Sequence, residues 1–119
     1  MNIIHKIETA SKGVLILFLQ GRMLSNENFE ELLGAIDKGM DEGNNNFIID
    51  LQELTHLNSS GLNTLLKCFT KLRSAGGELV LTQVNSHIEN IFEISKLKSI
   101  FNICASTREA LNFLNAQEA

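Results

Sequence analysis

The sequence predicts an α/β fold with a mixed, largely parallel sheet of about five strands and about four helices. Short apolar runs of strand length alternate along the chain with segments whose apolar residues recur at helical spacing. The first two apolar runs, however, are separated only by a short turn, which is typical of a β-hairpin. We therefore expect one antiparallel strand at the start and right-handed crossovers between the parallel strands that follow.

The N-terminal hairpin is expected to join strands at Ile3–Glu8 and Val14–Gln20 through the turn Ala10–Gly13. The second of these segments begins with an uninterrupted apolar run, Val14–Leu19. A continuous run of this length indicates a strand that is covered on both faces. It is far shorter than the roughly 20 residues that a helix needs to cross a bilayer.

The first helix should begin at Ser25 or Asn26 and end near Gly43. Glutamates in its first turns complement the positive end of the helix dipole. Its apolar residues recur at helical spacing and should face the sheet. These residues are Phe29, Leu33, Ile36 and Met40.

A second buried strand is predicted at Phe47–Leu51, which is again almost entirely apolar. The helix that follows is indicated by Leu62, Leu65, Leu66, Phe69 and Leu72, which recur at helical spacing. Gly76 and Gly77 supply its stop. Ser59 and Ser60 therefore stand at or near the N-cap of this helix.

The last part of the chain repeats the strand and helix pattern twice. Strands are expected at Glu78–Thr82 and at about Ile100–Cys104. The capping boxes Ser86-x-x-Glu89 and Ser106-x-x-Glu109 should open the two helices that follow. The positions expected to face inward are Ile88, Ile91, Phe92, Ala110, Leu111 and Leu114.

Composition favours one compact domain that spans residues 1–119. The 119 residues are 44% hydrophobic, and a chain of this size buries about two-thirds of its unfolded surface. No linker, repeat or charge block interrupts it. The net charge is −4 with acids spread along the chain, which argues against a nucleic-acid surface.

The N-terminus has neither the basic segment nor the long apolar core of a secretory signal, so we expect a cytoplasmic protein without direct membrane insertion. Cys68 and Cys104 both lie in apolar patterns and form no disulfide framework. His5, His56 and His87 fall on separate predicted elements, and neither cysteine has a partner at ligand spacing. No metal or cofactor site is therefore expected.

The loops at the carboxyl ends of parallel strands are where partners of such sheets bind. They are expected at Arg22–Ser25, Gln52–Ser59 and Gln83–Asn85. A partner surface should therefore involve Met23, Leu24, His56, Leu57 and Ser60. In the alternative interpretation, the apolar members of this set only pack their loops against the core.

Ser59 and Ser60 would face the electropositive start of a helix. A phosphate on either serine would be stabilised there by about 0.3–1 kcal/mol. The pair is thus a candidate phosphorylation switch, although Asn-Ser-Ser is also a common helix cap that needs no function.

A serine hydrolase is a distant alternative, with Ser59 or Ser60 as nucleophile and His56 or His87 as base. The spacing is against it, because a nucleophile elbow has glycine two residues before and two after the serine. Here those positions hold Asn58 and Leu62.

The run Asn58-Ser59-Ser60-Gly61-Leu62, placed after a strand that ends in Asp-Leu, resembles the signature of STAS domains, the anti-sigma-factor antagonist family. The usual form in that family is Asp-Ser-Ser-Gly-Leu, so Asn58 is a departure. The likeness extends over nearly the whole chain: Leu19-Gln-Gly21, Gly77–Leu81 and Ser106–Leu111 fit the family in order and spacing.

The resemblance implies that Ser60 is the residue phosphorylated by a partner, an anti-sigma factor with serine-kinase activity. Unphosphorylated protein would sequester that partner. Ser59 would then be the helix cap. Other single-domain members are accessory subunits of membrane lipid transporters or non-phosphorylated scaffolds, and Asn58 leaves both alternatives open. If the usual Asp helps orient or activate the serine, Asn58→Asp should speed phosphorylation while leaving the fold intact. Charge repulsion opposes this effect, and we expect the acceleration to prevail.

Overall fold

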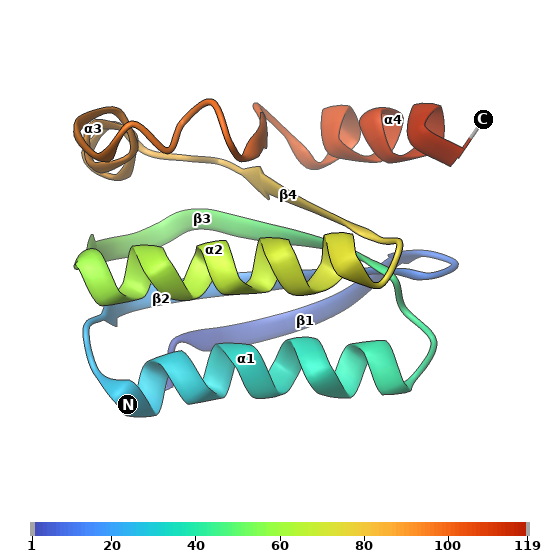
Figure 1. Cartoon of the computed structure of the whole chain (residues 1–119), viewed down its shortest axis with the longest axis horizontal. Helices are drawn as coiled ribbons and strands as arrows, with labels where there is room; N and C mark the ends of the chain where they lie inside the picture. Colours follow the sequence, from blue (N-terminus) through green and yellow to red (C-terminus); the bar gives the residue numbers. More distant parts are fainter. Residues whose placement is uncertain (1, 119) are drawn as a thin grey trace.

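The computed structural model describes residues 2–118 and confirms the α/β fold (Figure 1). Five strands form one sheet: β1 (Ile4–Ser11), β2 (Val14–Met23), β3 (Asn46–Leu57), β4 (Glu78–Thr82) and β5 (Asn102–Cys104). Four helices accompany it in the described part of the chain: α1 (Asn26–Asp41), α2 (Ser59–Ser74), α3 (Ser86–Ser95) and α4 (Thr107–Glu118).

The strands lie in the sheet in the order in which they occur along the chain. β1 is antiparallel to β2, and the remaining neighbours are parallel, which confirms the predicted hairpin and the mixed sheet. The carboxyl ends of β2 and β3 therefore lie at the same edge, beside the starts of α1 and α2, at the left of Figure 1. This edge contains the serine pair.

Helices cover both faces of the central strands. Successive side chains of a strand point to opposite faces, so each of these strands contributes to two apolar clusters. On one face, Leu17 and Ile49 belong to a large core shared with residues of α1, α2 and α3. On the other face, Ile16 and Ile48 pack in a smaller cluster with Ala110 and Leu114 of α4. This double burial explains the continuous apolar runs in β2 and β3.

β2 and β3 extend further than the sequence predicts. They end at Met23 and Leu57 rather than Gln20 and Leu51, so the predicted loops at residues 22–25 and 52–59 are mostly strand. The extra residues stay paired, with Arg22 opposite His56 and Met23 opposite Leu57, across two shifts in register. The added residues are largely polar and exposed, and their register is irregular, so the spacing of apolar residues does not reveal that the strands continue.

Helix starts differ from the prediction at α3. Asn85, not Ser86, is the N-cap, and its Oδ1 accepts the Ile88 backbone N–H at 3.0 Å. At α4 the Ser106 Oγ accepts the Glu109 backbone N–H at 3.2 Å. This is one of the two hydrogen bonds of the predicted capping box.

The inward face of α1 is also shifted. Leu32 and Ile36 are fully buried, whereas Phe29, Leu33 and Met40 are only half-buried. Ser25 caps α1 as predicted, because its side chain accepts the Asn28 N–H. All five of these apolar residues belong to the main core or pack against it, so the helix lies against the sheet as expected.

The two cysteines are free. Cys68 is buried in α2, and burial raises the pKa of its thiol to about 12, so the thiol stays protonated and unreactive near neutral pH. Cys104 lies in β5, where desolvation raises its pKa, with a further contribution from Glu109. None of the helices between residues 2 and 118 has the length and apolar character needed to cross a membrane.

Candidate functional site

The serine pair begins α2 directly after β3, with only Asn58 between the two elements. Asn58 has extended backbone angles, and its Oδ1 accepts the Gly61 N–H at 2.8 Å. It is therefore the N-cap of α2, and the prediction that Ser59 is the cap is wrong. Ser59 and Ser60 are the first two helical residues, and both are exposed. Asparagine and serine are both favourable N-cap residues, so the sequence alone does not tell which residue caps α2; the backbone conformation decides it.

We expect Asn58→Ala to lower the free energy of unfolding by about 0.5–2 kcal/mol, because it removes the cap. Ser59→Ala should change it by less than about 0.5 kcal/mol, since an exposed serine inside the first turn has no capping role. Urea denaturation of both variants measures the difference. A larger loss for Ser59→Ala than for Asn58→Ala would contradict this capping assignment.

Gly61 lies at a close contact between three elements. A Cβ built on it would lie 2.9 Å from the Met23 backbone oxygen and 2.6 Å from a Leu57 methyl carbon. Gly61 itself is buried. The glycine of the motif therefore lets α2 approach the end of β2 closely.

The hydroxyl of Ser60 is available for chemistry. Within residues 2–118, neither its hydroxyl nor that of Ser59 makes a hydrogen bond. Ser60 lines a groove of about 290 Å³ between α1 and α2. The polar residues that share this groove are Asn26, Glu30, Asn63, Thr64 and Lys67. A group added to Ser60 would thus meet both helices.

The start of α2 carries no compensating negative charge. α1, α3 and α4 have Glu27, Glu89 and Glu109 in their first turns, whereas the first turn of α2 has no acid. The neutral amide of Asn58 keeps this end electropositive, where an aspartate would partly cancel the helix dipole. The location of Ser60 therefore favours an added anionic group.

Part of the predicted partner surface is buried. Met23 is 0% and Leu57 is 7% exposed, so the prediction that they contact a partner is wrong. Both belong to the main core, as the alternative interpretation holds. Leu24 is 36% exposed, and His56 and Ser60 are also exposed, so these three stay available at this edge.

His56 and His87 come together, although they belong to β3 and α3. Their ring centroids are 6.0 Å apart. The Thr55 hydroxyl donates to the Gly21 carbonyl, so the Nδ1–H of His56 must be the donor in its 2.9 Å contact with Thr55 Oγ1. Sequence reasoning missed this neighbourhood, because it depends on how α3 docks on β3.

The hydrolase alternative gains no support from this arrangement. In residues 2–118 no hydrogen bond joins a histidine to Ser59 or Ser60, and His56 is instead bonded to Thr55. A nucleophile needs a base within hydrogen-bond reach.

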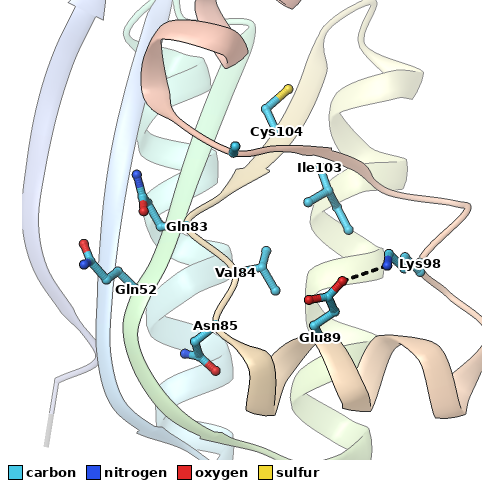
Figure 2. A pocket seen from close by; sticks show the side chains of 9 residues that line it. Gln52, Gln83, Val84, Asn85, Glu89, Lys98, Ile103 and Cys104 are labelled. Carbon is cyan, nitrogen blue, oxygen red and sulfur yellow. Dashed lines mark hydrogen bonds and ion pairs between the residues drawn. The ribbon is translucent and has the colours of Figure 1, made fainter.

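A second cavity, of about 530 Å³, lies at the carboxyl ends of β4 and β5 (Figure 2). Gln52 and Gln83 line one side of it, and Glu89 and Lys98 form an ion pair of 2.7 Å on the other. The serine pair takes no part in its lining. The groove between α1 and α2, rather than this cavity, is thus the hollow that adjoins the motif.

Comparison with known proteins identifies the family of this chain. The STAS domain profile matches residues 6–110. BtrV of Bordetella bronchiseptica, a candidate anti-sigma factor antagonist, is 38% identical over 98 residues, covering 82% of this chain and 83% of that protein.

Solved structures share the fold. A candidate anti-sigma factor antagonist of Thermotoga maritima has a TM-score of 0.81 at 20% identity, covering 92% of this chain and 93% of that one. The unphosphorylated form of the anti-sigma factor antagonist SpoIIAA has a TM-score of 0.77 at 18% identity, covering 93% and 96%.

Proposed function

Because this chain belongs to the STAS domain family, we propose that it is an anti-sigma-factor antagonist whose partner binding is controlled at Ser60. The proposed partner is an anti-sigma factor with serine-kinase activity. Unphosphorylated protein binds and sequesters that partner, and phosphorylation of Ser60 ends the pairing. The antagonists of this family are regulatory proteins rather than enzymes.

One observation carries the proposal: Ser60 presents an unbonded, exposed hydroxyl at the acid-free start of α2. A kinase can reach such a hydroxyl without unfolding the domain. The helix dipole then stabilises the phosphate by about 0.3–1 kcal/mol.

Release of the partner follows from charge and volume. A phosphoserine adds about −1.5 to −2 charges at neutral pH. The groove beside Ser60 contains one acid, Glu30, and one base, Lys67, so phosphorylation makes a nearly neutral groove strongly anionic. A partner that covers Ser60 must then desolvate this charge, and its affinity falls. The fold itself need not change.

We further propose that residues 1–119 act as one domain in the cytoplasm, where such a kinase would meet it. The sheet supports the single domain, because each strand pairs with its neighbour in one continuous sheet.

Co-purification of the tagged chain, with mass spectrometry of the bound proteins and of the peptide that contains Ser59 and Ser60, tests the proposal. We expect a kinase-like anti-sigma factor and a phosphate on Ser60. Recovery of a transporter ATPase with no phosphate would instead support the accessory-subunit role that Asn58 leaves open.

A further inference from the structure

We propose that Asn58 fixes the corner between β2 and α1 to the first turn of α2, so that Leu24 and Ser60 meet the partner as one surface. This inference rests on the proposed function for its consequence, but its structural part can be tested without a partner. It also gives a reason for an amide, rather than a carboxylate, at this position of the motif.

The side chain of Asn58 makes two hydrogen bonds in opposite directions. Its Oδ1 accepts from Gly61 N–H at 2.8 Å, and its Nδ2 donates to the Leu24 carbonyl at 3.2 Å. We call these two bonds the Asn58 bridge. The second bond joins residues 34 positions apart, and so ties the end of β2 to the start of α2.

The corner itself sits directly on α2. The Met23 backbone oxygen lies 2.9 Å from where a Gly61 Cβ would be. Two residues beyond Leu24, Asn26 lines the same groove as Ser60. The Asn58 bridge therefore sets where the exposed Leu24 side chain stands relative to the Ser60 hydroxyl.

Asn85 has the same arrangement at the start of α3. Its Oδ1 caps the helix through Ile88 N–H at 3.0 Å, and its Nδ2 donates to the Leu54 carbonyl at 2.9 Å. Asn85 does not line the groove that contains Ser60. It therefore offers a matched control for any general effect of replacing a bridging asparagine.

Aspartate could fill only half of this role. Its oxygen caps a helix about as well as that of asparagine. An ionised carboxylate has no hydrogen to donate, however, and it would stand against the Leu24 carbonyl oxygen, which is also an acceptor. Asn58→Asp should therefore keep the cap, free the corner, and add a negative charge near Ser60. The sequence-based expectation that this change leaves the fold intact is revised at this corner.

Hydrogen exchange tests the structural part. The Asn28 and Phe29 amides bond to Ser25 in the first turn of α1 and report on opening of the corner. In Asn58→Asp and Asn58→Ser they should exchange roughly three- to tenfold faster, as expected for the loss of one net hydrogen bond. In Asn85→Asp they should be unchanged. Unchanged exchange in both Asn58 variants would overturn the bridge.

Binding tests the consequence, with the anti-sigma factor that co-purifies with the tagged chain as the probe. Asn58→Ser removes the amide donor without adding charge, and should weaken binding roughly three- to tenfold. Asn58→Asp also adds a negative charge near Ser60, so it should weaken binding at least as much. Asn85→Asp should change it less than about twofold. Weak binding by Asn58→Asp alone, with wild-type affinity for Asn58→Ser, would mean that charge rather than the bridge is responsible.

The experiments distinguish failure of the proposed function from failure of the Asn58 bridge. If no variant at Ser60 affects binding, the proposed function fails, whatever the exchange data show. If Ser60→Glu weakens binding but both Asn58 variants bind like wild type, the switch stands and the inference about Asn58 is overturned.

Discussion

Gly61→Ala should lower the free energy of unfolding by about 1–3 kcal/mol, the usual effect of forcing extra volume into a packed site. The added methyl would lie 2.9 Å from the Met23 carbonyl oxygen, which belongs to a paired strand and cannot turn aside like a side-chain end. It would also lie 2.6 Å from a Leu57 methyl carbon. α2 would have to move away from the end of β2.

Gly34→Ala is the matched control. Gly34 is an exposed residue of α1 with nothing within 4 Å of the position that its Cβ would occupy. The substitution should stabilise the protein by up to about 1 kcal/mol through helix propensity. Urea denaturation midpoints of the two variants should therefore move in opposite directions. A neutral or stabilising Gly61→Ala would show that the close approach of α2 to β2 is not required.

Ser60→Glu should weaken binding of the anti-sigma factor about tenfold or more, equivalent to about 1.4 kcal/mol. A carboxylate carries less charge than a phosphate, so its effect is only part of the effect of phosphorylation. Ser60→Ala should stay close to wild-type affinity, because it adds neither charge nor volume in the groove. Titration calorimetry measures both variants.

Ser59→Glu is the control for that experiment, because it adds the same charge one residue away from Ser60. Ser59 is exposed beside Ser60 but does not line the groove between α1 and α2. Its effect on binding should be smaller than that of Ser60→Glu. Equal affinity for Ser60→Glu and Ser60→Ala would place Ser60 outside the interface.

The fold was predictable from periodicity because apolar runs and helical spacing report burial directly. Strands covered on both faces, such as the first part of β3, stand out as continuous apolar segments. The polar ends of β2 and β3 do not, and so both strands were predicted too short. Pairing between two half-exposed segments is a property of the sheet and not of either segment alone.

The site was predictable in its position but not in its details. The motif places Ser60 at a helix start, and the structure shows it in the first turn of α2. Whether Met23 and Leu57 face a partner or the core depends on strand extension, and both are buried. The hydrogen bond from Asn58 Nδ2 to the Leu24 carbonyl joins residues far apart in the sequence, so no local sequence pattern predicts it.

The most direct test compares the affinity of the co-purified anti-sigma factor for this chain before and after stoichiometric phosphorylation by that partner, with the phosphorylated residue located by mass spectrometry. The proposal predicts one phosphate on Ser60 and a loss of affinity greater than the roughly tenfold effect of Ser60→Glu. Unchanged affinity of the Ser60-phosphorylated chain, or a phosphate on Ser59 instead, would contradict it.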